Sequence, residues 1–176
     1  MDHIMTQTVK DMIERRSIRK YKPDQISEEQ LQEILEAGKY AASGMGRQPV
    51  KMVVIQDKET IAQLSKMNAK IMGKDIDPFY GAPTVIVVLA DKSAFTYYAD
   101  GSLTIGNLMN AAHAVGVESC CIHRATEEFE SEEGKALLKK WGIEGDYAGI
   151  GHCILGQRDC EYPKAAPRKE DMVIRI

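Results

Sequence analysis

The side chains with the clearest capacity for chemistry lie in residues 15–22, whose sequence is Arg-Arg-Ser-Ile-Arg-Lys-Tyr-Lys. Five of these eight residues are basic, although the formal net charge of the chain at pH 7 is −3. Arginine presents a planar set of donors that matches a phosphate group, and Ser17 adds a hydroxyl donor. The cluster therefore predicts a phosphate-binding site. The alternative is a solvated helix end, where cations complement the helix dipole and have no further function.

A second cationic group lies near the C-terminus and contains Lys164, Arg168 and Lys169, with Pro163 and Pro167 stiffening the chain around it. Alone, such a segment is typical of a solvated tail. If the fold brings it beside the first basic cluster, the two groups together would form a phosphate clamp. A nucleic-acid surface is disfavoured, because the chain is acidic overall and no aromatic platform accompanies the basic residues.

The four cysteines are Cys120, Cys121, Cys153 and Cys160. Structural zinc sites usually separate paired cysteines by about two to four residues, and adjacent cysteines in a strand face opposite sides of the sheet. We therefore expect no metal site, and buried thiols that behave as small apolar side chains. The first residues lack the basic and apolar regions of a signal peptide, which favours a reduced, cytoplasmic protein.

The order of helix and strand signals indicates the elements that position these residues. Ser27 and Gln30 have the spacing of a capping box, so a helix is expected to follow Ser27. We expect helices at 8–16, 27–39, 98–115 and 132–141, a helix around 61–71, and strands at 51–56, 84–90, 117–122, 147–155 and 172–176. The pattern predicts a sheet with helices on both faces, of the α/β or α+β class.

The composition fits one compact domain over residues 1–176, with 44% hydrophobic residues and no apolar run long enough to cross a membrane. The expected helix 98–115 is apolar on every side and rich in small residues, which predicts burial at the centre of a protomer or on a symmetry axis. The expected terminal strand follows a long polar arm, residues 157–176, so it is free to pair with its own sheet or with a partner's.

Residues 14–21 resemble the opening motif of the FMN-dependent nitroreductase family. Weaker similarities follow in the family's order at 41–49, 80–88, 100–120, 151–156 and 167–169. The resemblance spans nearly the whole chain. It implies an α+β sandwich with a central mixed sheet flanked by helices, an intertwined homodimer whose C-terminal arm packs on the partner, and FMN at the subunit interface.

The resemblance also implies roles for the basic residues. Arg15, Arg16 and Ser17 would hold the FMN phosphate and nearby ribityl oxygens, and Arg168 would complete the phosphate clamp. Arg19 would approach the N1 and O2 edge of the isoalloxazine ring. A cation there would stabilise the negative charge that reduction leaves at N1.

The remaining site residues implied by the resemblance surround the flavin ring. Ser43 and Met45 would come from the other subunit. Ile122 and His123 correspond to positions where family members present backbone N–H groups to the flavin O4 and N5 atoms. Asn68 would contact the pyrimidine ring. No side chain is expected to act as a general acid, because solvent can deliver protons in an open site.

The activity that the resemblance implies is FMN-dependent oxidation of NADH or NADPH, with a nitroaromatic, a quinone or a similar small molecule as the second substrate. Two alternatives stay open. The first is a flavin-binding or redox-sensing protein without turnover. The second is a domain without flavin that binds phosphate ligands or nucleic acid through residues 15–22.

Overall fold

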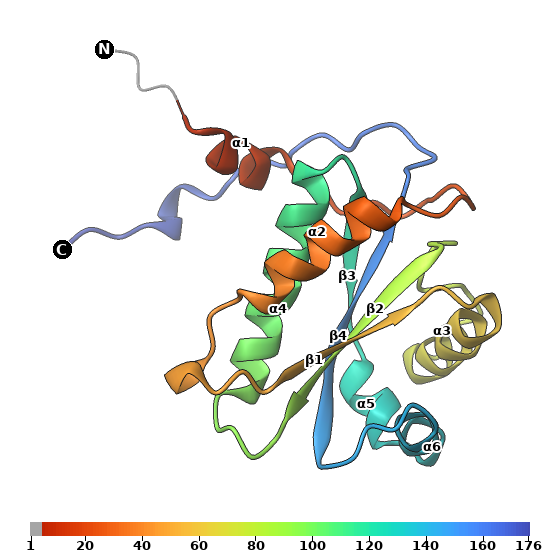
Figure 1. Cartoon of the computed structure of the whole chain (residues 1–176). Helices are drawn as coiled ribbons and strands as arrows, with labels where there is room; N and C mark the ends of the chain where they lie inside the picture. The colour runs from red at the N-terminus through yellow and green to blue at the C-terminus, as the bar shows by residue number, and fades with distance from the viewer. Residues whose placement is uncertain (1–4) are drawn as a thin grey trace.

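The computed structural model describes residues 5–176 and contains one four-stranded sheet (Figure 1). Its strands are β1 (Val50–Ile55), β2 (Thr84–Asp91), β3 (Glu118–Ile122) and β4 (Tyr147–Gly156), in the spatial order β1-β2-β4-β3. β2 is central and almost completely buried, as its unbroken run of apolar residues predicts. β3 is an edge strand of this sheet. The predicted α+β sandwich is confirmed.

The helices form a layer on each face of the sheet (Figure 1). α2 (Glu28–Lys39) and α4 (Tyr97–Ala114) cover one face, while α3 (Lys58–Met72), α5 (Ala125–Glu130) and α6 (Glu132–Lys140) cover the other. Two clusters of buried apolar side chains separate along the same division. α1 (Gln7–Glu14) lies beside α4 and has no buried residue. Two short 3-10 turns, η1 (Gly44–Gly46) and η2 (Glu170–Met172), complete the elements.

The prediction of a mixed sheet is wrong, because all three strand pairings are antiparallel. α3 follows β1, but residues 73–83 bring the chain back to the end at which β1 finished, so that Ile55 lies opposite Val85. A connection that returns to the same end of a sheet makes neighbouring strands antiparallel. Among residues 5–176, the one parallel pairing is an isolated bridge between Ser17 and Ser119.

Several predicted elements are confirmed at nearly the predicted bounds. The Ser27 side chain accepts a hydrogen bond from the Gln30 backbone, and the Gln30 side chain accepts one from the Ser27 backbone, so the capping box starts α2 as expected. The sequence interpretation missed α5, which lies soon after β3. Its sequence, Ala-Thr-Glu-Glu-Phe-Glu, is too short to show a helical period.

The predicted terminal strand at 172–176 is wrong for the isolated chain. The arm leaves the sheet after β4 and ends far from it (Figure 1). Its last residues follow η2 without joining the sheet, and Val173, Ile174 and Ile176 are exposed. A strand needs a neighbour to satisfy its backbone groups, and this end of the arm has none within residues 5–176.

Two alternatives were expected for the helix now called α4, burial at the centre of a protomer or on a symmetry axis. Within the single chain only one flank of α4 is buried, and burial of the other flank on a symmetry axis stays a prediction. Ile105, Leu108 and Ala112 pack against the sheet. Leu103 on the other flank is 52% exposed, and Met12 and Ile13 of α1 are exposed too. Within residues 5–176, no helix is long and apolar enough to cross a membrane.

Candidate functional site

The predicted phosphate-binding segment is fixed against the edge strand β3. The Ile18 N–H donates to the Ser119 carbonyl at 3.0 Å, and Ser17 forms the parallel bridge with Ser119. The Ile18 side chain is fully buried. It anchors the segment that contains Arg15, Ser17 and Arg19. Ile18, together with the buried Tyr21 of the same core cluster, holds the surrounding polar side chains at the start of β3.

The guanidinium nitrogens of Arg16 differ in their contacts. Nη1 donates to the carbonyls of Ile13, Glu14 and Arg15 at 2.7–2.9 Å, which satisfies acceptors that the end of α1 leaves free. The alternative interpretation, a cationic helix end, therefore describes this one nitrogen correctly.

Two other guanidinium nitrogens of the cluster lack acceptors. Arg16 Nε and Arg15 Nη1 are buried, and neither has a hydrogen-bond partner within residues 5–176. A buried charged donor without a partner loses free energy relative to water, so an anion at this position would relieve the deficit. The donor set therefore fits a phosphate group.

Arg15 and Arg19 both lie near Cys120 on β3. Burial raises the pKa of the Cys120 thiol, and the nearby charges of Arg19 and Arg15 oppose that rise. Cys120 is a buried side chain, so it is a neutral thiol and not a nucleophile. The other three cysteines are also free thiols. Within the described residues, no three His, Cys, Asp or Glu side chains cluster in a way that could hold a metal ion.

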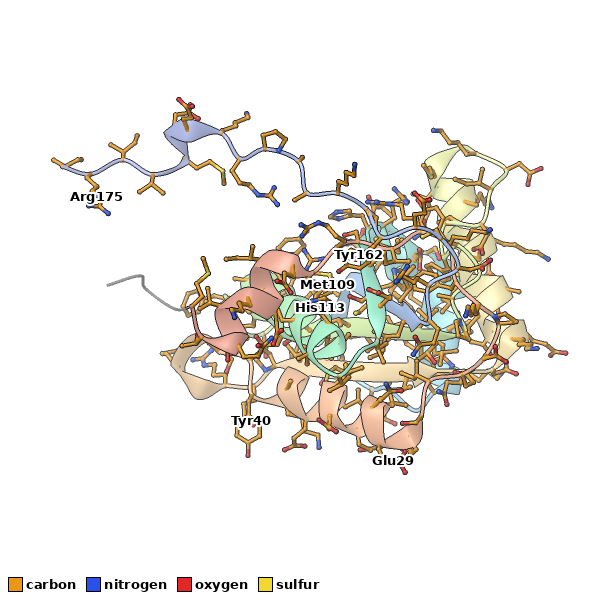
Figure 2. The ribbon with its side chains drawn as sticks, turned by 90° about the horizontal axis from the view of Figure 1, so that it is seen from above. Glu29, Tyr40, Met109, His113, Tyr162 and Arg175 are labelled. Atoms are coloured by element: carbon orange, nitrogen blue, oxygen red, sulfur yellow. The ribbon has the colours of Figure 1, made fainter. Side chains whose placement is uncertain are left out.

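Tyr162 closes one side of the cluster and was not identified from the sequence. Its hydroxyl donates to the Glu14 carbonyl at 3.0 Å and lies 3.5 Å from His113 Nδ1. The centroids of the His113 and Tyr162 rings are 6.4 Å apart, with the ring planes inclined by 27 degrees. Figure 2 labels both residues. The guanidinium of Arg158 lies over the tyrosine, 5.5 Å from its ring centroid. These contacts hold the start of the C-terminal arm against α1.

A second group of predicted residues lies at the other end of β3. Ile122 is the last residue of the strand, and the exposed His123 follows it. The strand rises about 3.3 Å per residue, so Ser119 and Ile122 are about 10 Å apart along it. β3 thus connects the arginine cluster at its start with the Ile122–His123 peptide groups at its end.

Asn68 reaches this strand end from α3, but its amide is already used within the chain. Nδ2 donates to the His123 carbonyl at 2.8 Å, and Oδ1 accepts from Arg124 Nε at 2.8 Å. The side chain is fully buried. Its contact with a flavin ring stays a prediction, and the structure gives it a second task, which is to hold the backbone after β3.

Ser43 and Met45 lie at the opposite end of α4 from the arginine cluster. The Gly44 N–H donates to Asp100 Oδ1 at 3.1 Å, which ties this loop to the first turn of α4. At about 1.5 Å of rise per residue, the ends of this long helix are about 27 Å apart. Met45 is 71% exposed. One small ligand therefore does not reach both groups within one chain, and the contribution of Ser43 and Met45 by the other subunit stays a prediction.

The structure does not bring Arg168 into the arginine cluster. Arg168 is exposed in the arm, and no hydrogen bond joins residues 163–176 to the remainder of the described chain. A separate hollow of about 380 Å³ between α3 and residues 77–83 contains none of the predicted site residues. The candidate site is therefore β3 with the segments that flank it.

The fold and this site define an α+β protein in which a partly buried arginine cluster lies at the start of β3 and the Ile122–His123 peptide groups lie at its end. Residues 12–157 match the model of the nitroreductase family. That match covers most of the sequence, so the chain belongs to the nitroreductase family, as residues 14–21 indicated.

Individual relatives agree with this assignment. A protein of Archaeoglobus fulgidus, provisionally named NADH dehydrogenase/NAD(P)H nitroreductase, is 31% identical over 165 residues, which are 91% of this chain and 87% of that protein. A nitroreductase of Desulfitobacterium hafniense, solved with bound FMN, is similar with a TM-score of 0.87 and 26% identity, covering 98% of this chain and 100% of that chain. A Bacteroides fragilis nitroreductase with bound FMN has a TM-score of 0.90 at 23% identity, covering 98% and 100%, and shows the shared fold.

Proposed function

We propose that this protein is an FMN-dependent NAD(P)H oxidoreductase that acts as a homodimer. The observation that carries the proposal is the pair of buried guanidinium nitrogens, Arg15 Nη1 and Arg16 Nε, that lack an acceptor within residues 5–176. The FMN bound by the Desulfitobacterium relative and the NAD(P)H in the name of the Archaeoglobus relative support the choice of cofactor and donor.

In the proposed enzyme, the residues at the start of β3 bind the cofactor phosphate. Arg15 and Arg16 donate from their unpaired nitrogens, and Ser17 adds its hydroxyl. Arg19 is exposed beside them, free to place a positive charge near the pyrimidine edge of the ring. The Ile122 and His123 backbone would bind the opposite polar edge.

When bound, FMN supplies hydride transfer at N5, from NADH or NADPH and then to a nitroaromatic, a quinone or a similar acceptor in a ping-pong cycle. The chain contributes binding, orientation and charge. No side chain of the candidate site is assigned as a general acid.

The second subunit completes the site in this proposal. Its Ser43 and Met45 would border the ring, and its Arg168 would join the phosphate contacts. The apolar residues that α1, α4 and the arm expose support a homodimer, because water otherwise contacts them. We infer that residues 1–176 form one domain whose arm, residues 157–176, packs on the partner. The four free thiols and the use of NAD(P)H favour the cytoplasm.

The test is an absorbance spectrum of the purified protein with FMN, before and after anaerobic addition of NADH and then NADPH. Flavin bands that bleach with either nucleotide would support the proposal and identify the donor. Bands that stay unbleached would replace it with a flavin-binding protein without turnover. Failure to bind FMN would overturn it.

A further inference from the structure

Three buried polar side chains meet behind the end of β3, and two of them, Glu128 and His152, have no role in the function proposed above. Asn68 on α3, Glu128 on α5 and His152 on β4 are each 0% exposed. Burying a carboxylate and an imidazole together opposes folding unless their polar atoms find partners. A buried polar group of this kind requires an explanation, and its contacts supply one.

Glu128 lies at the centre of the group. Its Oε2 is 2.9 Å from His152 Nε2, although the approach is not along a hydrogen-bond direction. Its Oε1 accepts a short hydrogen bond from Asn68 Nδ2. The ring of Phe79 packs on the imidazole with centroids 5.1 Å apart and helps to exclude water. In such a dry environment, each polar contact is stronger than it would be at the surface.

The group binds three successive carbonyl oxygens of the chain from the end of β3. His152 Nδ1 lies 3.4 Å from the Ile122 oxygen. Asn68 Nδ2 donates to the His123 oxygen at 2.8 Å. The backbone N–H of Glu128 donates to the Arg124 oxygen at 3.0 Å. The Glu128 side chain thus contacts both side chains that lie against the first two carbonyls, whereas the bond to the third is the ordinary backbone bond of the first turn of α5.

This arrangement determines where the next N–H groups point. In a trans peptide, the carbonyl and the following N–H point in opposite directions, and residues 5–176 contain no cis peptide. Because the Ile122 and His123 oxygens point inward, the His123 and Arg124 N–H groups point away from the buried group. Neither N–H donates a hydrogen bond to any residue in the described range.

The backbone at Arg124 is strained and needs this support. Its φ of 77 degrees is positive, in the left-handed region that side-chain-bearing residues rarely adopt. The Arg124 side chain donates from Nε to Asn68 Oδ1, so the same buried group that holds the carbonyls also holds this residue. Strained residues persist where their surroundings overdetermine them, and they gather at functional sites.

We propose that Glu128 is a positioning residue for the cofactor ring: through Asn68 and His152 it fixes residues 122–124 so that the His123 and Arg124 N–H groups face the ring's polar edge. This inference rests on the proposed function, because it takes the ligand at the end of β3 to be FMN. Two fixed donors at that edge favour the more electron-rich reduced ring over the oxidised ring.

The variant that tests the inference is Glu128→Gln, which keeps the size of the side chain and replaces one of the two carboxyl oxygens that contact Asn68 and His152 by an amide nitrogen. The affinity for reduced FMN is expected to fall about tenfold more than the affinity for oxidised FMN, equivalent to a two-electron midpoint potential lower by about 30 mV. The matched control is Glu127→Gln, since Glu127 is the exposed neighbour on the same helix. The control should leave both affinities and the potential unchanged.

A measurement without FMN separates this inference from the proposed function. In the apo protein, the backbone amide signals of His123 and Arg124 in a nitrogen-15 NMR spectrum should be single in the wild type, and broadened or doubled in Glu128→Gln. If no form of the protein binds FMN, the proposed function fails. The amide signals then still report whether Glu128 orders this turn.

The inference is overturned if Glu128→Gln leaves the amide signals unchanged, or if it weakens both redox states of FMN equally. The second result would show a structural role only. Should Glu128→Gln fail to fold, His152→Gln serves as the second variant, because it keeps the carboxylate and alters the contact with the Ile122 carbonyl. The same redox asymmetry is expected, and its absence overturns the inference.

Discussion

At the scale of single residues, the arginine cluster contains two kinds of guanidinium nitrogen, one that binds backbone carbonyls and one that lacks an acceptor within residues 5–176. Arg16 Nη1 binds three carbonyls at the end of α1, whereas Arg16 Nε and Arg15 Nη1 are buried without acceptors in the described part of the chain. The sequence predicted a phosphate site here but not this division, because spacing alone does not show which nitrogen a backbone carbonyl will use.

Arg15→Ala removes a donor that has no partner in the described chain. It breaks no hydrogen bond, because the Arg15 side chain makes none within residues 5–176. FMN affinity should fall about ten- to a hundredfold, since a charge-assisted hydrogen bond contributes about 1.5–3 kcal/mol. A fluorescence titration of the apo protein with FMN measures the effect. Lys10→Ala, which removes an exposed cation from α1, is the control and should leave the affinity unchanged. An equal loss in both variants would indicate general attraction of the phosphate rather than a contact.

Arg19→Ala should act on the potential more than on the affinity. The side chain is exposed, and its proposed role is to stabilise the charge that reduction places on the ring. The midpoint potential of bound FMN should fall by about 30 mV for each tenfold by which the affinity for reduced FMN falls more than the affinity for oxidised FMN. A spectroscopic redox titration measures this. An unchanged potential together with a loss of affinity like that of Arg15→Ala would contradict the assignment.

At the scale of helices and strands, local signals determined how much of the fold the sequence predicted. The unbroken apolar run from Val85 to Ala90 identified β2 as a central strand, and a capping box located the start of α2. The direction of neighbouring strands was mispredicted, because it depends on how residues 73–83 fold back, and no local pattern records that path. The exposure of Leu103 was left open between two alternatives, since composition does not distinguish burial by the chain's own core from burial by another subunit.

Local sequence signals also determined how much of the candidate site the sequence predicted. Arg15 and Ser17 lie beside the start of β3, and Ile122 and His123 lie at its end, so the residues that the family resemblance grouped all lie on or beside one strand. Glu128 and His152 were not identified, because they are distant in the sequence and meet only through the packing of α5 on β4.

The packing of α5 on β4 depends on one glycine. A Cβ atom at Gly149 would overlap the backbone carbonyl of Ala125, the first residue of α5. Backbone atoms do not move aside as a flexible side chain would, so Gly149→Ala should destabilise the fold by about 1–3 kcal/mol. Thermal unfolding followed by circular dichroism should show a midpoint lower by about 2–10 °C. An unchanged midpoint would mean that α5 approaches the sheet less closely than the structure describes.

At the scale of the whole molecule, the isolated chain leaves apolar side chains exposed and the proposed site incomplete. The arm exposes Val173, Ile174 and Ile176, and α1 and α4 expose Met12 and Leu103. The proposed site is incomplete in the same way, because Ser43 and Arg168 lie away from the arginine cluster of their own chain. One partner subunit would answer both deficits, by covering the apolar residues and supplying the missing polar ones.

Removal of residues 163–176 tests that argument. The truncation keeps the Tyr162 hydroxyl that binds the Glu14 carbonyl, so the body of the chain should still fold. Light scattering coupled to gel filtration should show a dimer for the full chain and a shift toward monomer for the truncated one.

Arg168→Ala separates the two tasks of the arm, since it keeps the apolar end and removes the predicted phosphate contact. It should stay dimeric while its affinity for FMN falls about tenfold, the loss of one charge-assisted contact. A truncated chain that remains dimeric and binds FMN as tightly as the full chain would show that the arm neither holds the partner nor completes the site.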